Sequence, residues 1–168
     1  MPFIFERRRN LFFNENKSGN IYATVKGKLK PITDVKDEMF ANNLMGQGLA
    51  IDPVDKVICS PIAGKLTLVA DTLHAFGIEG RDGLQVLVHI GVDTVKYNGH
   101  GFKQLKEVGC DVHENEAIIE FDYSYYEKEG IDTSVMTIIL NSQEFMVTNV
   151  IDEGEATLQS CVAKYKKI

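Results

Sequence analysis

The sequence predicts an all-β fold, namely an antiparallel β-sandwich or a barrel-like relative of it with short helical turns. Short segments rich in β-branched, aromatic and alternating apolar residues recur after residue 20. Glycine or proline residues interrupt the chain between these segments, so little room is left for long helices. Many short strands without long intervening helices are typical of sandwiches and barrels, and not of parallel α/β sheets.

Several segments carry the strand pattern, and each is bounded by turn-forming residues. The expected strands cover residues 21–25, 65–69, 84–90, 117–121, 135–140, 146–150 and 157–162. Residues 35–44 and 123–129 have room for short helices. In the segment 84–90, alternation places the even-numbered apolar residues on one face and leaves Gln85, Leu87 and His89 on the other. His89 is therefore expected on a strand, facing away from the most apolar side.

Length and composition agree with one globular domain. The chain has 168 residues, of which 44% are apolar and 25% are charged, and both fractions are close to the globular average. It lacks the long apolar run that a membrane-spanning helix needs. Its three cysteines are far apart, which indicates reduced thiols and a cytoplasmic location. The net charge of −6 argues against nucleic-acid binding, because phosphate neutralisation needs a basic face.

The N-terminal residues differ in composition from the rest. Residues 1–20 carry four basic and two acidic residues, a surplus of +2, so the other residues together carry −8. Four phenylalanines lie within residues 1–13. Either this stretch forms an amphipathic helix that contacts a membrane surface or a partner, or it is a terminus that packs on its own domain or on nothing. We therefore divide the chain into a flexible basic and aromatic tail, residues 1–19, and one domain, residues 20–168.

Common nucleotide-binding and hydrolase motifs are absent from the sequence. Gly46-Gln47-Gly48 begins like a dinucleotide-binding loop, but Ile51 replaces the third glycine and Pro53 follows where a helix should continue. The sequence has no phosphate-binding P-loop, no G-x-S-x-G and no H-E-x-x-H. The histidines are therefore the remaining candidates for chemistry.

Two of the four histidines stand out. His113 lies in a polar turn and His100 lies between two glycines. His89 is near the end of a strongly apolar strand and close to Gly91, whereas His74 follows another strand, with a threonine two residues before it. A histidine on a strand is more often structural than catalytic, and the spacing of this pair is not diagnostic of a metal site. A structural role therefore stays open at this point.

Residues 83–95, which read GLQVLVHIGVDTV, resemble the phosphorylation-site motif of the glucose-type enzyme IIA proteins. These proteins belong to the bacterial phosphoenolpyruvate-dependent sugar phosphotransferase system. The resemblance covers residues 20–165 and includes, in family order, segments 46–53, 60–64, 72–76, 99–102 and 108–122. Gln47 and His100 stand where the family has acidic residues, and Asn115 stands where glycine is usual.

The resemblance implies a phosphocarrier, an EIIA type-1 domain over residues 20–168, with an antiparallel β-sandwich fold. His89 would accept a phosphoryl group from the phosphohistidine of the carrier HPr. It would then pass the group to a cysteine of the sugar-specific IIB domain, which works with the membrane component IIC. His74 is implied as the second active-site histidine, with Thr72 supporting it. Asp93 is implied near the site, in phosphoryl release or partner contact.

Transfer between proteins also needs an apolar docking rim. The candidates for this rim, each of which would otherwise be an ordinary core residue, are Met39, Phe40, Leu44, Met45 and Phe76. Gly91 is expected to leave the approach to His89 open. The expected partners are HPr and the IIB/IIC permease, with peripheral membrane contact through residues 1–13, and the chain is expected to act as a monomer.

A regulatory binding module is the alternative function that the resemblance implies. In that function the unphosphorylated form binds and inhibits sugar-uptake proteins. Phosphoryl transfer requires no cofactor, whereas a zinc ion bound by His74 and His89 is an option for the regulatory complex. A zinc peptidase of the lysostaphin kind is disfavoured, because its pattern of histidine and aspartate ligands is missing.

Overall fold

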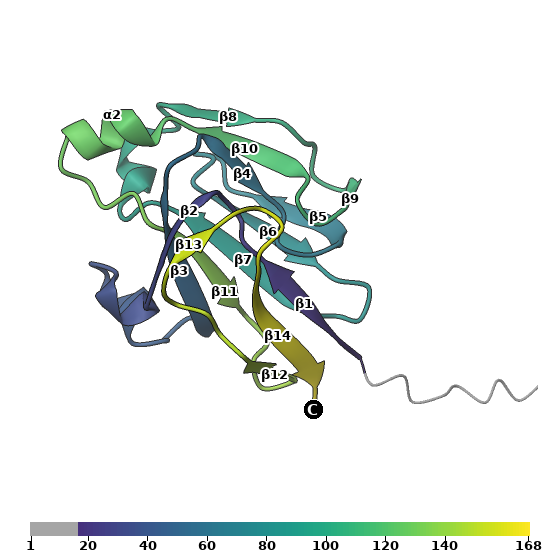
Figure 1. Cartoon of the computed structure of the whole chain (residues 1–168). Helices are drawn as coiled ribbons and strands as arrows, with labels where there is room; N and C mark the ends of the chain where they lie inside the picture. Colours follow the sequence, from purple (N-terminus) through teal and green to yellow (C-terminus); the bar gives the residue numbers. More distant parts are fainter. Residues whose placement is uncertain (1–16) are drawn as a thin grey trace, which may run out of the picture.

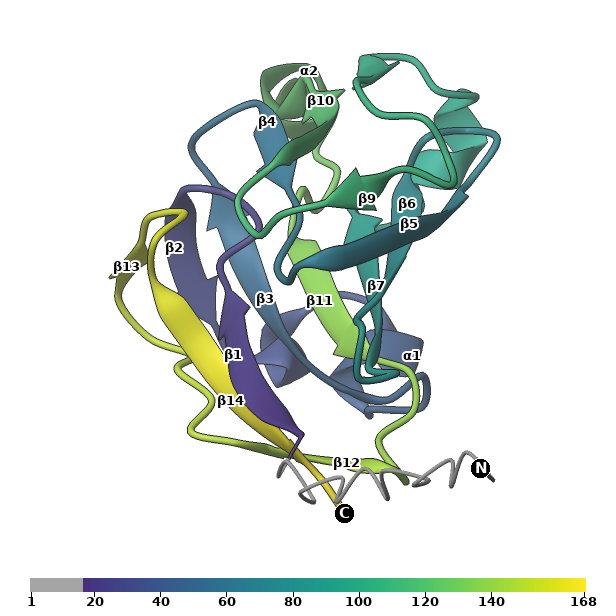
Figure 2. The same cartoon turned by 90° about the vertical axis from the view of Figure 1, so that its right-hand side faces the viewer.

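The computed structural model describes residues 17–168 (Figures 1 and 2). The strands are β1 (Ser18–Tyr22), β2 (Gly27–Lys30), β3 (Gln47–Pro53), β4 (Val57–Cys59), β5 (Gly64–Val69), β6 (Ala75–Glu79), β7 (Gln85–Ile90), β8 (Phe102–Gln104), β9 (Asp111–Val112), β10 (Ala117–Phe121), β11 (Val135–Ile139), β12 (Phe145–Thr148), β13 (Glu155–Ala156) and β14 (Cys161–Lys167). The helices are the 3₁₀-helices η1 (Ile32–Asp34) and η2 (Thr94–Tyr97) and the α-helices α1 (Glu38–Ala41) and α2 (Tyr123–Lys128). No helix in this described part is long and apolar enough to cross a bilayer.

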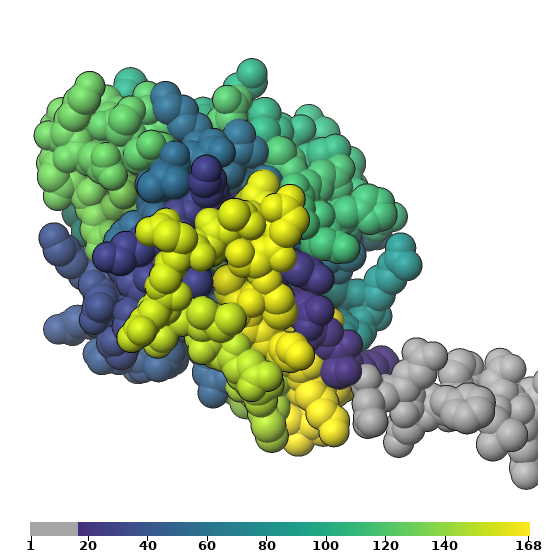
Figure 3. Space-filling model, viewed as in Figure 1, coloured from purple at the N-terminus to yellow at the C-terminus, as the bar shows by residue number. Residues whose placement is uncertain are grey.

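The strands pair in antiparallel fashion and form three sheets. The largest sheet has the order β13-β2-β3-β11-β7-β6-β5-β9, and the smaller sheets have the orders β1-β14-β12 and β4-β10-β8. Figure 3 shows β1 and β14, which pair with each other, on one face of the molecule. The predicted all-β antiparallel fold is confirmed. Among the described residues, the largest sheet ends at β13 and β9 and does not close into a barrel.

The main hydrophobic core draws side chains from all three sheets. It contains Ile21 from β1, Val162 from β14, Phe121 from β10, and Val86 and Val88 from β7, each at most 1% exposed. Burial of this apolar surface is the main driving force for folding. The alternation predicted for residues 84–90 is confirmed, because the even-numbered residues of this segment are buried in the core.

A second hydrophobic cluster lies on the other side of the largest sheet and includes residues from the segment between β2 and β3. The segment contributes Ile32, Val35 and Phe40, and the sheet contributes Ala50, Ala75, Leu87, Met136 and Ile138. Side chains on a strand alternate between its two faces, so Leu87 points away from Val86 and Val88. Strand β7 is therefore packed on both faces, by the main core on one and by this cluster on the other.

Several element limits differ from the predictions. β1 begins at Ser18, so residues 18–20 pair with β14 although 18 and 19 were expected in the tail. β14 covers Cys161–Lys167 and not 157–162, because pairing with β1 and β12 decides its extent. The expected helix over 35–44 shortens to α1. The two interpretations of residues 1–13, an amphipathic docking helix or a terminus without such a role, concern residues outside the described part.

Two residues predicted for the docking rim, Phe40 and Phe76, are buried instead. Phe76 is 0% exposed and lies in the main core, whereas Phe40 is 5% exposed and belongs to the second cluster. The prediction was wrong for both, because apolar character alone does not separate a core residue from a docking residue. Met39 and Leu44 are exposed, at 52% and 71%, and Met45 is half-buried.

The burial of Phe76 predicts a large effect of its truncation on stability. We expect Phe76→Ala to lower the free energy of unfolding by about 3–5 kcal/mol, because it removes a buried ring and leaves a cavity. The control, Met39→Ala, should change it by no more than about 0.5 kcal/mol, because Met39 is largely exposed. Urea unfolding followed by circular dichroism measures both values. A loss below about 1 kcal/mol for Phe76→Ala would contradict the core assignment.

Candidate functional site

His74 and His89 meet on neighbouring strands of the largest sheet. His89 lies on β7, opposite Ala75 of β6 and Met136 of β11. His74 directly precedes β6, and its carbonyl accepts a hydrogen bond from the Ile90 amide at 2.7 Å. The two imidazole rings have centroids 5.1 Å apart and lie edge to face at 73°. The structure therefore brings together the two histidines that the sequence singled out.

A tight turn presents His74. Within it, the Ala70 carbonyl accepts a hydrogen bond from the Leu73 amide at 2.8 Å. Leu73 has a φ of +60°, a left-handed conformation that is unusual for a bulky residue and costs about 1–3 kcal/mol. Thr72 Oγ1 lies 2.6 Å from His74 Nδ1. Thr72 therefore contacts the His74 ring at this nitrogen, and its supporting role stays a prediction.

The environment of His89 favours the neutral ring. Its Nδ1 atom is buried and makes no hydrogen bond of good geometry, although the Gly91 backbone is close enough to favour the protonated ring. The Phe40 ring packs against it, with centroids 4.8 Å apart. Burial and the neighbouring His74 lower the pKa of His89 to about 4, against the opposing effects of Gly91, Asp37 and Asp93.

His74 is neutral for a related reason. The residue is half-buried, and burial lowers its pKa from the ordinary 6.5. Both rings are therefore uncharged at pH 7, and each keeps one nitrogen with a free lone pair. On His89 the buried nitrogen is Nδ1, so Nε2 is the atom on the opposite edge of the ring.

The loop after His89 contains Gly91 and Asp93. Asp93 is exposed, has a φ of +59°, and its Oδ2 lies 3.7 Å from the Nζ atom of Lys96. Gly91 has a φ of +73°, and a Cβ atom there would lie 2.4 Å from the Thr94 side chain. This turn therefore has no room for a side chain at residue 91, and the role of Gly91 in leaving the approach to His89 open stays a prediction.

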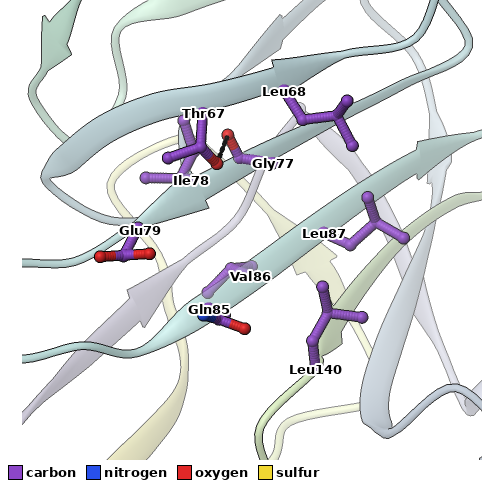
Figure 4. A pocket seen from close by; sticks show the side chains of 9 residues that line it. All are labelled: Thr67, Leu68, Gly77, Ile78, Glu79, Gln85, Val86, Leu87 and Leu140. Carbon is purple, nitrogen blue, oxygen red and sulfur yellow. Dashed lines mark hydrogen bonds between the residues drawn. The ribbon is translucent and has the colours of Figure 1, made fainter. Parts of the chain in front are cut away.

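An apolar groove follows β7 away from the histidines. It has a volume of about 210 Å³, and its lining includes Leu68, Leu87 and Leu140 (Figure 4). Leu68 and Leu140 are 50% and 40% exposed. Leu87 and His89 are two residues apart on one strand and share a face, so the groove adjoins the histidine pair.

Two of the groove residues were not predicted. Leu68 is two residues from the buried Leu66, and simple alternation would place both in the core. The pairing of β5 with β6 shifts register between Leu66 and Leu68, and this bulge accompanies the exposure of Leu68. Leu140 was expected at the end of a strand, but it lies one residue beyond the end of β11. No signal in the sequence would have identified the bulge.

The other histidines are not part of this pair. His113 is exposed, as predicted. His100 is also exposed. Its ring packs at a tilt against Tyr125 with centroids 4.4 Å apart, and its carbonyl accepts a hydrogen bond from the Tyr126 hydroxyl. Among residues 17–168, no group of three or more histidine, cysteine or acidic side chains is placed to hold a metal ion. His74 and His89 would therefore supply only two ligands of a zinc site.

Comparison with known proteins shows the family of the chain. Residues 19–145 match the family model described as phosphoenolpyruvate-dependent sugar phosphotransferase system, EIIA 1. A glucose-specific EIIA component of Staphylococcus aureus strain COL is 36% identical over 134 residues, which cover 80% of this chain and 81% of that protein. A glucose-specific EIIA component of Staphylococcus epidermidis strain RP62A is 39% identical over 129 residues, covering 77% and 78%.

Two further comparisons concern a longer protein and a solved structure. A glucose-specific EIICBA component of Staphylococcus saprophyticus is 34% identical over 145 residues, covering 86% of this chain but only 21% of that protein. The structure of glucose permease IIA from Mycoplasma capricolum matches with a TM-score of 0.77 at 28% identity, covering 92% of this chain and 99% of that one. This match agrees with the antiparallel architecture.

The low pKa of His89 predicts a pH dependence of stability. The unfolded chain binds a proton at this histidine below pH 6.5, whereas the folded chain does so only near pH 4. Stability should therefore fall as the pH falls through this window, by as much as about 3 kcal/mol from this group. Urea unfolding at several pH values should show that His89→Gln loses less stability than wild type between pH 7 and pH 4. Equal losses would contradict the burial of a neutral His89.

Proposed function

The chain belongs to the EIIA 1 family of the phosphoenolpyruvate-dependent sugar phosphotransferase system, and we propose that it is a cytoplasmic phosphocarrier that uses His89. In this proposal the phosphohistidine of HPr donates the phosphoryl group, and a cysteine of a sugar-specific IIB domain accepts it. The observation that carries the proposal is the half-buried, neutral His89 ring set edge to face against His74.

The geometry of His89 favours Nε2 as the attacking atom. Nδ1 is buried, so a donor protein is expected to reach Nε2; attack through the lone pair of Nε2 leaves the hydrogen of the neutral ring on Nδ1. In the transfer, a bond forms between Nε2 and phosphorus as the bond between phosphorus and the donor nitrogen breaks. Because the ring is neutral at pH 7, no base has to remove a proton before the attack.

His74 would stabilise the transferred group. If the Thr72 hydroxyl donates its hydrogen bond to Nδ1 of His74, the ring hydrogen is on Nε2. That N–H then donates a hydrogen bond to a phosphoryl oxygen on His89, whose ring centroid is 5.1 Å away. Phosphoryl transfer depends on positioning and on stabilising charge, so a fixed donor at this place assists it.

The apolar surface beside the histidines would receive the partner proteins. Its exposed members are Met39, Leu44, Leu68 and Leu140, and Phe40 supports the surface from beneath. Asp93 is exposed at the edge of the site and would contact a partner, because a carboxylate facing the phosphoryl group would repel it. This chain matches only 21% of the EIICBA component, whose name also covers IIB and IIC parts. This joining of the three parts in one protein supports a IIB/IIC permease as the acceptor.

A regulatory role is the second candidate. The two histidine rings are close enough for a shared ligand, and a zinc site built on them would need further ligands from a partner protein. The unphosphorylated chain would then bind sugar-uptake proteins through the same surface. Phosphorylation of His89 would remove a ligand nitrogen and end this binding.

Substitution of the two histidines tests the phosphocarrier. With phosphoenolpyruvate, enzyme I and HPr, the wild-type chain should acquire an acid-labile phosphoryl group. His89→Ala should reduce this labelling to background, because the accepting nitrogen is lost. His74→Ala should still be labelled but should transfer to IIB more slowly, by about 100- to 1,000-fold, the range seen when a single stabilising donor is removed.

The outcomes separate the roles of the two residues. Unchanged labelling of His89→Ala, or no labelling of wild type, would rule out the phosphocarrier assignment. Normal onward transfer by His74→Ala would remove His74 from the mechanism. A zinc-dependent pull-down of a sugar-uptake protein that phosphorylation abolishes would support the regulatory role instead.

A further inference from the structure

Residues 132–134, just before β11, hold the loop that follows His89. The backbone carbonyl of Asp132 accepts a hydrogen bond from the Val92 amide at 2.8 Å, and that of Ser134 accepts one from the Gly91 amide at 2.8 Å. These two bonds fix the backbone directly after the reactive histidine. The Gly91 backbone is in turn one of the polar groups that act on the His89 ring.

The Asp132 side chain holds a second segment. Its Oδ2 accepts a hydrogen bond from the Lys36 amide at 3.2 Å, a contact between residues 96 positions apart in the sequence. Lys36 lies just before α1, which carries Phe40. The Phe40 ring packs on His89 with centroids 4.8 Å apart. One residue therefore contacts both segments that enclose the imidazole of His89.

The chemistry of this contact requires a carboxylate. Both Asp132 oxygens are used, because Oδ1 accepts hydrogen bonds from the amide of Ser134 at 2.9 Å and from its hydroxyl. Only 8% of the side chain is exposed, and Lys30 Nζ lies 3.8 Å from Oδ1. Burial alone raises the pKa of Asp132, but the hydrogen bonds from Ser134 and Lys36 and the charge of Lys30 lower it overall.

We propose that Asp132 is a positioning residue for His89, because it ties the Phe40 segment and the loop after β7 to the start of β11. This inference rests on the proposed phosphocarrier function. Asp132 touches no reacting atom in this scheme. Its contribution is to keep Nε2 of His89 aimed at the donor, since small displacements of a reacting group cost rate in phosphoryl transfer.

Asp132→Asn tests this role with little change in shape. An amide presents one acceptor oxygen, so its NH₂ group would face either the Lys36 amide or the Ser134 donors. We expect weaker NOEs between the Phe40 and His89 rings and faster hydrogen exchange at the Lys36 amide. The rate of phosphorylation at saturating phospho-HPr should fall at least about fivefold, with a smaller change in KM.

Asp52→Asn is the matched control. Asp52 also pairs with Lys30, at 2.9 Å, and its Oδ1 also accepts a hydrogen bond from the Ser134 hydroxyl, at 3.3 Å. Unlike Asp132, it is not bonded to the Lys36 amide. This variant should keep the ring NOEs and stay within about twofold of the wild-type rate. An equal loss in Asp52→Asn would overturn the proposal, because it would assign the effect to the charge cluster around Lys30. Wild-type NOEs and rate in Asp132→Asn would overturn it as well.

A second variant covers the case in which Asp132→Asn does not fold. Asp132→Ser keeps a local acceptor for the Ser134 amide but is too short to reach Lys36. It should lose the Lys36 protection and weaken the ring NOEs, and retention of both would contradict the proposal. The NMR measurements need no partner protein. The two failures can therefore be distinguished. If the wild-type chain is not phosphorylated, the phosphocarrier function is wrong, whereas if the NOEs are unchanged in the variants, the positioning role is wrong.

Discussion

The pairing of β7 with β6 on one side and β11 on the other is the constraint on which the site depends. It sets His89 opposite Ala75 and Met136, and it lets the Ile90 amide bind the carbonyl of His74. Backbone register therefore sets the place of His89 on the sheet. A slip by one residue would turn the core face of β7 outward, so the burial of its apolar residues specifies the position of the histidine.

The same pairing determines the protonation of His89. A ring held against a covered face of the sheet loses part of its hydration, and a second histidine beside it adds to the cost of a charge. A neutral ring is what a phosphoryl acceptor requires, because only the neutral form has a free lone pair. In the proposed function, the fold thus provides the chemical state of the nucleophile without a separate base. The cost is a stability that depends on pH.

Parts of this arrangement could be predicted from the sequence, and the reasons differ between elements. The alternation in residues 84–90 predicted which side chains lie on each face of β7, because one face packs on the main core and the other on the second cluster. β3 was missed because Leu49, Ala50 and Ile51 are all buried in a central strand and show no alternation. Leu68 was not predicted because a bulge in the pairing of β5 with β6 changes its face, and the alternation within β5 alone does not show a shift in register.

The docking rim was only partly predictable, for a related reason. Phe76 lies two residues after His74 and is as apolar as any docking residue, yet it faces the main core. Phe40 is buried as well, and its ring packs against His89. It would therefore act on a partner only through the position of His89 and not by direct contact. Composition identifies which residues are apolar, whereas the face of the sheet decides which of them remain accessible.

Unfavourable local conformations gather around the histidine pair. Leu73 and Asp93, one on each side of the site, both have positive φ values, and Nδ1 of His89 is buried without a hydrogen bond of good geometry. Such features persist only where the surrounding structure over-determines them. Here the surrounding structure is a sheet packed on both faces, with backbone hydrogen bonds to His74, Gly91 and Val92. The core therefore supplies the stability that allows two short turns to hold the rings in a reactive arrangement.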